Sequence, residues 1–467
     1  MATRGRPPVG SLLHLNNGND LPPADASSPS PDALAGASSN KDAPDALVIG
    51  AGLAGLSCAQ ALSKAGLRAD VLEATGEVGG RVRTVEHPDG FLLDRGFQVL
   101  LTAYPQAQRL LDYDALRLEP FYSGALVRYD GAFHRVADPF RHPRDLPATL
   151  MAPVGTPADK LRVGAASWRL RQRPLRELFA RPETTTAAAL RERFGFSEKI
   201  IARFFRPFLG GIFLESGALR TSSRMFAFVF RMFAEGGAAL PAGGMQAMPR
   251  QLARALPKDT VHFGTEVTAV EGQTVRLESG DGLEAPAVVV ATEAPEAARL
   301  LGAEAAGDVQ TESRSTTTVY FAAGRPPTDE AALMLNGTGA GPVNTAVVLS
   351  NVQPAYAPPG RALISASVLG DPPVSDDELE GEVRRQLRDW FGAGVEGWRA
   401  LRTVRVAYAL PEQAPPYLSP PMKRVRRRPG LYACGDHRRT ASINGALASG
   451  RAAAQAVLAD RRAGRLA

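Results

Sequence analysis

The chain has 467 residues, more than one hydrophobic core usually holds, so we expect two or three domains. Its hydrophobic fraction of 44% and aromatic fraction of 7% are those of an ordinary globular protein. The net charge of +6 arises from 54 basic and 48 acidic residues, and only six of the basic residues are Lys. Because the Arg residues are scattered along the chain, we interpret them as a composition bias. A nucleic-acid partner is excluded, since it would need positive charge gathered on one face.

The first 43 residues are rich in Pro, Ser and Ala and show no hydrophobic period. Such a segment cannot bury enough apolar surface to offset its ordering entropy, so we predict a disordered, dispensable tail over 1–43. Its acidic residues favour a plain tail over a transit peptide, and both alternatives stay open. The sequence has no secretory signal pattern and no apolar run of about 18 residues. We therefore expect a cytoplasmic protein, and a peripheral contact with a membrane stays open.

A strand, a glycine-rich turn and a helix are predicted directly after this tail. Residues 46–49 are an apolar strand, 53–64 carry apolar residues at helical spacing, and 68–72 are a second strand. The turn reads Gly50-Ala51-Gly52-Leu53-Ala54-Gly55, which is the dinucleotide-binding fingerprint in its proper strand–helix–strand context. The pattern predicts a site for the phosphates of a dinucleotide at the helix N-terminus.

Each glycine of this fingerprint has a physical role. Gly50 permits the tight turn, Gly52 lets the backbone approach the pyrophosphate, and Gly55 lets the helix pack on the strand. Glu73 follows the second strand, where a carboxylate binds ribose hydroxyls and disfavours the 2′-phosphate of NADP. The same letters recur over 392–397, but after a predicted helix and with no strand behind them, so we interpret that copy as a helix end and loop.

The rest of the chain is predicted from period and composition. We expect a mainly helical segment over 135–235, strands over 261–263, 287–291, 316–322, 345–350, 362–368, 402–409 and 431–434, and helices over 376–390 and 445–461. Cys58 and Cys434 lie in apolar stretches, so we expect small buried residues. Together with six scattered His residues they predict no metal site.

The residues after Glu73 indicate which dinucleotide is bound. Glu73-Ala74-Thr75-Gly76-Glu77-Val78-Gly79-Gly80-Arg81-Val82-Arg83-Thr84 resembles the second fingerprint of the flavin-containing amine oxidase superfamily. The resemblance implies FAD, with Gly80 and Arg81 around its phosphates and ribityl chain. Near the C-terminus, Asp436 then corresponds to the residue that meets the ribityl or pyrophosphate region. The N–H of Ile443 corresponds to the donor at the flavin N1/O2 edge.

The resemblance also extends to the middle of the chain. Residues 241–245 and 264–267 match superfamily segments, and Val267 takes the position whose backbone holds the adenine, although a plain buried strand residue is nearly as good an interpretation. The complete set of predicted cofactor-binding residues is Gly50, Gly52, Leu53, Ala54, Gly55, Glu73, Ala74, Gly80, Arg81, Gly96, Val267, Asp436 and Ile443. No catalytic side chain is predicted, because flavin carries the chemistry.

Three stretches are more similar to the plant and cyanobacterial phytoene and ζ-carotene desaturases than to monoamine oxidases: 96–106, 402–411 and 441–450. The amine oxidases usually keep a Lys near the flavin, whereas this chain has no Lys between 258 and 423. It also lacks a Cys placed for covalent flavin attachment. We therefore expect noncovalent FAD, an apolar substrate that loses a hydride, and oxygen or a quinone as electron acceptor, since only one nucleotide site is predicted.

The predicted fold is α/β, a discontinuous Rossmann-type FAD-binding domain with a mixed α+β substrate domain. We place the first over 45–125, 240–300 and 412–467, and the second over 126–239 and 301–411. We interpret the Phe-rich stretches within 200–233 as part of the hydrophobic core, in preference to the lining of a substrate tunnel or a contact with a membrane. We interpret the basic run 423–428 as a solvated turn, in preference to a contact with lipid headgroups. Two other functions stay open: an amine oxidase of the same superfamily, and a non-redox binding protein like the Rab GDP-dissociation inhibitors.

Overall fold

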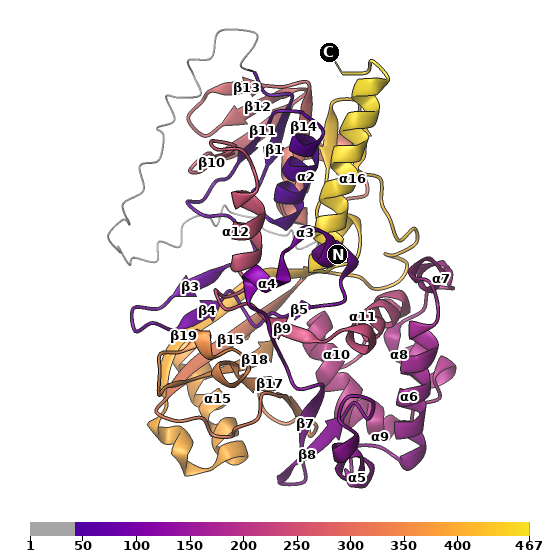
Figure 1. Cartoon of the computed structure of the whole chain (residues 1–467), viewed down its shortest axis with the longest axis vertical. Helices are drawn as coiled ribbons and strands as arrows, with labels where there is room; N and C mark the ends of the chain where they lie inside the picture. The colour runs from indigo at the N-terminus through magenta and orange to yellow at the C-terminus, as the bar shows by residue number, and fades with distance from the viewer. Residues whose placement is uncertain (1–42, 467) are drawn as a thin grey trace, which may run out of the picture. The chain divides into compact units, whose positions relative to one another are not determined.

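The computed structural model describes residues 43–466, and its first scaffold is a six-stranded sheet (Figure 1). In spatial order the strands are β10 (Val261–His262), β2 (Ala69–Leu72), β1 (Ala46–Ile49), β14 (Ala287–Val290), β21 (Leu431–Ala433) and β20 (Arg426–Arg428). All neighbours are parallel except β20, which is antiparallel to β21. β1, β14 and β21 are buried at every residue, which explains their uninterrupted apolar sequences.

Alternate residues of β1 face two different layers. Ala46 and Val48 belong to a core shared with the helices α2 (Leu53–Lys64), α12 (Ala247–Arg254) and α16 (Ile443–Arg462). Leu47 and Ile49 belong to a core shared with α13 (Ala294–Ala306) and with the small sheet of β11 (Val267–Glu271), β12 (Thr274–Leu277) and β13 (Gly282–Glu284). The central sheet is therefore covered on both faces.

The first and last helices of the described chain lie side by side (Figure 1). Ser57 of α2 donates a hydrogen bond to the carbonyl of Leu447 in α16 at 2.8 Å. A Cβ at Gly450 would lie 2.0 Å from the carbonyl oxygen of Ala54, so only glycine permits this approach of the two backbones. The contact fixes the start of α16 beside the turn that follows β1.

A second, seven-stranded sheet is built mainly from the middle of the chain. Its order is β19 (Arg399–Pro411), β15 (Ser313–Ala323), β18 (Ala362–Leu369), β17 (Val343–Val348), β16 (Leu333–Asn336), β7 (Gly124–Tyr129) and β8 (Ala132–Ala137). Helix α15 (Asp376–Phe391) covers one face through Leu379, Val383 and Leu387. The predicted strand 345–350 is wrong at its end, because the chain turns into the short helix α14 (Leu349–Val352) after Val348.

The predicted helical segment is confirmed. It holds α5 (Leu146–Met151), α6 (Pro157–Arg171), α7 (Leu175–Ala180), α8 (Thr186–Ala188), α9 (Glu198–Ile200), α10 (Arg206–Phe213) and α11 (Ser223–Glu235), with π-helical turns η2 (Ala189–Arg193) and η3 (Ile201–Phe205). Four of its Phe side chains, Phe205, Phe213, Phe226 and Phe228, are fully buried and pack in one core. For these four the interpretation as core is confirmed.

Short elements complete the described chain. They are β3 (Thr84–Glu86), β4 (Leu92–Asp94), β5 (Leu100–Leu101), α3 (Pro105–Leu110), α4 (Tyr113–Leu116), β6 (Glu119–Pro120), η1 (Pro143–Asp145), β9 (Ala238–Leu240), η4 (Pro354–Tyr356), η5 (Ala393–Gly397) and η6 (Asp436–Arg438). The second fingerprint copy is confirmed as a helix end, since α15 is capped by Gly392 and followed by the turn η5. The α/β class is confirmed. The tail predicted over 1–43 lies almost wholly outside the described residues.

Candidate functional site

The turn after β1 has the geometry that the fingerprint requires. Gly50 has φ +103°, and a Cβ there would lie 3.2 Å from the carbonyl oxygen of Ala291. A Cβ at Gly55 would lie 2.0 Å from the carbonyl oxygen of Gly50, so the helix lies directly on the turn. Leu53 and Ala54 belong to the first turn of α2, and the first N–H groups of a helix have no acceptor within the helix. Glycines are needed here for contact within the protein, not only for a ligand.

A second glycine segment lies opposite this turn. Gly79 donates its N–H to the carbonyl of Ala51 at 2.9 Å, and Gly52 and Gly79 form a parallel bridge. Gly79 has φ +128° and Gly80 φ +59°. A Cβ at Gly52 meets nothing closer than 4.0 Å, so the protein leaves open space above this residue. Two backbones without side chains thus border the same space.

Glu73 lies at the carboxyl end of β2 and is buried. Its carboxylate accepts hydrogen bonds from the N–H of Ala51 at 2.8 Å, from the N–H of Thr75 at 3.0 Å and from the hydroxyl of Thr75 at 2.7 Å. The negative charge is therefore fixed beside the glycine turn, while Ala74 is exposed.

The predicted adenine segment runs past the same residue. Thr265 donates its N–H to the carbonyl of Glu73 at 2.9 Å, and Val267 begins β11 as a buried residue two positions later. Val267 is also part of the hydrophobic core on that face of the sheet. Both interpretations of Val267 fit this position, and its contact with adenine stays a prediction.

Arg81 and Asp436 form an ion pair although 355 positions separate them. The distance between the Arg81 guanidinium and the Asp436 carboxylate is 2.6 Å, and Arg81 also donates to the carbonyl of Ala409 at 3.1 Å. Asp436 follows β21, so the pair joins the loop after the second glycine segment to the carboxyl end of the central sheet. Arg81, Glu73 and both glycine segments thus gather at one edge, where α/β folds bind ligands.

Ile443 begins α16, and its N-terminal turn is shaped by two neighbours. Ser442 is the N-cap and accepts a hydrogen bond from Gly445 at 3.0 Å, and the side chain of Asn444 accepts from the N–H of Gln106 at 2.9 Å. The N–H of Ile443 donates to no other residue in the described part of the chain. It is available to a ligand at a helix N-terminus.

Gly96 lies where the seven-stranded sheet meets this site. It has φ +81°, and its Cα faces Thr316 of β15 and Val406 of β19. The next residue, Phe97, donates its N–H to the hydroxyl of Thr318 at 3.3 Å, and Thr318 pairs with Val404 across β15 and β19. The strand on which the resemblance led us to look for a Lys is β15, which has Thr residues and no Lys.

Two polar side chains at this edge were not predicted. The hydroxyl of Thr292, which follows β14, is buried without a partner among the described residues and borders the Gly50 turn. Both ring nitrogens of His437 are likewise buried and unpartnered. Burial lowers the pKa of His437 to about 4, against the opposing effect of Asp436, so the ring is neutral near pH 7. Adjacency to Asp436 was the one signal that pointed to His437.

Glu293 adds a further charge near Arg81. Burial raises its pKa, Arg81 and Arg95 act in the opposite direction, and Asp436 adds to the increase. Glu293 precedes α13, and no hydrogen bond or ion pair of its carboxylate is found within residues 43–466. Its position after a buried strand was a signal that the sequence contained.

FAD fits these residues. The open space above Gly52, which Gly80 borders, would accommodate phosphate oxygens, Glu73 suits ribose hydroxyls, and Arg81 supplies positive charge. The unpartnered Thr292 hydroxyl and His437 ring are buried polar groups that a bound polar ligand would satisfy. Within the described residues, no group of three or more His, Cys, Asp or Glu is arranged to hold a metal ion.

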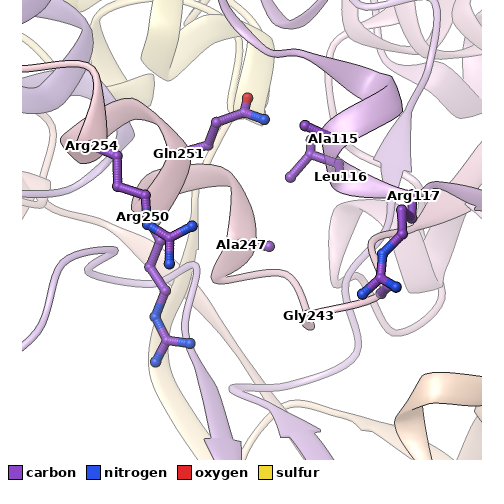
Figure 2. A pocket seen from close by; sticks show the side chains of 9 residues that line it. Ala115, Leu116, Arg117, Gly243, Ala247, Arg250, Gln251 and Arg254 are labelled. Atoms are coloured by element: carbon purple, nitrogen blue, oxygen red, sulfur yellow. The ribbon is translucent and has the colours of Figure 1, made fainter.

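A separate pocket of about 280 Å³ lies between α4 and α12 (Figure 2). Arg250 and Arg254 border it on one side and Arg117 on the other, with Ala247 and Gly243 between them. Arg250 lies 3.7 Å from Glu77. None of the predicted cofactor-binding residues lines this pocket, so it is not the proposed flavin site.

Comparison with known proteins matches residues 53–458 to the family of flavin containing amine oxidoreductases. Protoporphyrinogen oxidase 2 of Arabidopsis thaliana is 41% identical over 70 residues, 15% of this chain and 14% of that protein. The 15-cis-phytoene desaturase of Narcissus pseudonarcissus is 38% identical over 66 residues, 14% of this chain and 12% of that protein. The matched stretches thus span no more than 14% of the curated relatives' own length.

Several solved structures have a backbone fold similar to that of most of this chain. An Exiguobacterium protein provisionally named protoporphyrinogen oxidase has a TM-score of 0.65 at 18% identity, with 89% of this chain and 98% of that chain covered. Putrescine oxidase bound to putrescine has a TM-score of 0.63 at 18% identity, with 89% and 99% covered. Reduced UDP-galactopyranose mutase has a TM-score of 0.65 at 16% identity, with 89% and 96% covered. At such identity the likeness shows the fold, and the predicted Rossmann-type arrangement with a mixed α+β region is confirmed.

Proposed function

The chain belongs to the flavin-containing amine oxidoreductase family, and we propose that it uses noncovalent FAD to take a hydride from an apolar small molecule. Oxidoreductase activity and the flavin cofactor follow from family membership, in agreement with the sequence prediction. The class of substrate, the electron acceptor and the individual FAD contacts are the proposal.

One observation supports the proposed FAD contacts: residues that are far apart in the sequence lie together at one edge of the central sheet. Gly52 borders open space, the Glu73 carboxylate is held beside it, and Arg81 is held by Asp436. Bound flavin supplies the hydride-accepting chemistry. The residues of this chain bind the phosphates and ribose, orient the ring system through the N–H of Ile443, and exclude water. Val267, Gly96 and Ala74 complete the proposed contacts.

An apolar substrate is supported by the side chains beside Gly96. Phe97 and Val404 are partly buried hydrophobic residues that flank Thr318, and β15 offers no Lys in their neighbourhood. Neither residue offers a charge to an ammonium group. This environment favours a desaturation of an isoprenoid-like molecule over oxidation of a small amine, and oxygen or a quinone then reoxidises the flavin.

Amine oxidation is the second candidate, because the fold is shared with putrescine oxidase. Anaerobic mixing of the purified flavoprotein with polyenes and with small primary amines separates the two. We expect polyenes to bleach the flavin absorbance and amines to leave it unchanged. Rapid bleaching by amines alone would replace the proposal by the amine oxidase. A colourless preparation unable to bind added FAD would favour a non-redox binding protein.

A further inference from the structure

Exposed apolar side chains are concentrated in one short part of the described chain. Six of the ten large hydrophobic side chains that are exposed lie between 140 and 168: Phe140, Leu146, Leu150, Met151, Leu161 and Trp168. Met151 is 84% exposed, Leu161 74% and Phe140 70%. Single exposed hydrophobic residues are ordinary, but a group of this kind marks an interaction surface.

Helix α6 shows that the exposure follows a regular pattern. Pro157, Leu161, Ala165 and Trp168 recur at helical spacing and are all exposed. The opposite face is buried through Ala166 and Leu170. The helix therefore has one apolar stripe in the core and a second apolar stripe in solvent.

Helix α5 extends the same surface. The ammonium group of Lys160 in α6 donates to the carbonyl of Leu150 at 2.6 Å and to the carbonyl of Ala152 at 2.8 Å. These bonds hold the C-terminal end of α5, with Leu150 and Met151, against the first turn of α6, one residue from Leu161. We call the exposed side of α5 and α6 with Phe140 the α5–α6 surface.

The surface is also strongly basic. The segment 140–176 holds eight Lys and Arg residues against two Asp, a net charge of +6 that equals the net charge of the whole chain. This segment is therefore more basic than the chain as a whole. Both acids already have partners: Asp145 accepts a hydrogen bond from Tyr122, and buried Asp159 belongs to the capping box of α6 and lies 3.6 Å from Arg162 of the same helix.

Several of these cations have no partner. Arg144, Arg169 and Arg171 are exposed, and no ion pair or hydrogen bond of their guanidinium groups occurs within the described residues. Apolar side chains flanked by unpaired Arg match the boundary of an anionic bilayer, where acyl chains lie next to phosphate groups. The charge complements the lipid phosphates, and the exposed Trp, Leu, Met and Phe side chains gain burial that a nucleic acid would not offer.

We infer that the α5–α6 surface docks on the surface of an anionic lipid bilayer. The apolar side chains enter the boundary between headgroups and acyl chains, and the Arg side chains contact the phosphates. No helix of the described chain is long and apolar enough to cross a membrane, so the contact is peripheral. The inference goes beyond the proposed redox function and does not depend on it.

Co-sedimentation of the full chain with vesicles tests this inference. We expect binding to phosphatidylcholine vesicles containing phosphatidylglycerol, weaker binding to phosphatidylcholine alone, and release by high salt. Trp168 is a built-in probe, because Trp390 and Trp398 are buried. Its emission should shift to the blue on binding, and a Trp168→Phe variant should lose that shift.

Matched variants locate the contact. Arg144→Glu/Arg169→Glu should lower binding by at least about tenfold, whereas Arg385→Glu, an exposed and unpaired Arg on α15, should not. Met151→Ser/Leu161→Ser should lower binding by about tenfold, whereas Phe263→Ser/Met422→Ser, at exposed positions elsewhere, should not. Flavin content should stay that of the wild type in all four variants, which separates this test from that of the redox proposal.

Three results would overturn the inference. The first is failure of the wild type to bind anionic vesicles. The second is equal loss of binding in the control variants. The third is an oligomer in solution that Met151→Ser/Leu161→Ser converts to a monomer, because a second copy of the chain would then cover the surface.

Discussion

At the scale of single residues, Gly52 and Gly55 are glycines for different reasons. A side chain at Gly55 would collide with the carbonyl of Gly50, whereas Gly52 borders open space. Gly52→Val should therefore fold but place a branched side chain where the pyrophosphate is proposed to lie. We expect loss of most bound FAD, measured by flavin absorbance per protein, with the melting temperature of the apoprotein nearly unchanged.

Gly76→Val is the matched control, because a Cβ there also meets no atom within 4 Å and Gly76 lies on an exposed turn. It should retain wild-type flavin content. Full flavin content in a folded Gly52→Val protein would remove Gly52 from the cofactor site.

Asp94 and His437 should give opposite dependences of stability on pH. Asp94 is buried among Thr84, Met245 and Tyr356, and burial raises its pKa to about 6 from an ordinary value of 3.8. Its contribution is full below pH 3.8 and is lost as the pH rises through 6. His437 has its pKa lowered from 6.5 to about 4, so its contribution is full above pH 6.5 and is lost as the pH falls through 4.

Each contribution corresponds to about 3 kcal/mol, and the two nearly cancel in the wild-type apoprotein. In Asp94→Asn the free energy of unfolding should rise between pH 4 and pH 6 because only the His437 effect remains. In His437→Gln it should fall over the same interval. Urea unfolding of the apoproteins at several pH values measures both slopes, and parallel pH profiles for the two variants would contradict the prediction.

At the scale of elements, helix α11 shows how the Phe-rich segment contributes to stability. Phe226 is fully buried, 5.4 Å from the ring of Phe230 and 5.5 Å from that of Phe194. Phe226→Ala should lower the free energy of unfolding by about 3–5 kcal/mol through a cavity. Phe140→Ala, at a 70% exposed position, should change it little. Chemical denaturation measures both, and equal effects would contradict the assignment of Phe226 to the core.

Helices and strands were predictable from the sequence where the residues that stabilise the element all lie within or next to it. Helix α2 was predicted at its observed bounds, because a glycine turn leads into it and an apolar period and a terminal Lys lie within 53–64. The strands β15 and β19 were predicted too short, since their ends are extended by pairing with each other, and pairing partners far apart in sequence leave no local pattern.

At the scale of the whole molecule, the site depends on contacts that the sequence does not encode locally. The motifs predicted Arg81 and Asp436 separately, but their ion pair follows only from the fold. Thr292 and His437 were missed because an unpartnered buried atom is a property of three-dimensional packing. The division into an FAD-binding and a substrate domain stays a prediction.

The start of the described chain is linked to its C-terminal helix through one residue. The first strand starts at Ala46, and Asp45 just before it contacts two residues, Arg68 and Arg461. Its N–H donates to the carbonyl of Arg68 at 2.8 Å, and its carboxylate accepts from the N–H of Arg68 at 2.9 Å and contacts the guanidinium of Arg461 at 2.5 Å. Asp45 thus links the start of β1 to the end of α16.

A chain that begins at Ala43 should therefore keep the melting temperature and flavin content of the full chain. Asp45→Ala in that shortened chain should lower the free energy of unfolding by about 1–2 kcal/mol, because it removes an acceptor shared by Arg68 and Arg461. Asp281→Ala is the control, since Asp281 is an exposed residue whose carboxylate, among the residues that the structure describes, bonds only the nearby Ser279. Differential scanning calorimetry measures all three. A large loss of stability on removal of residues 1–42 alone would show that the dispensable part of the chain is shorter than the sequence predicts.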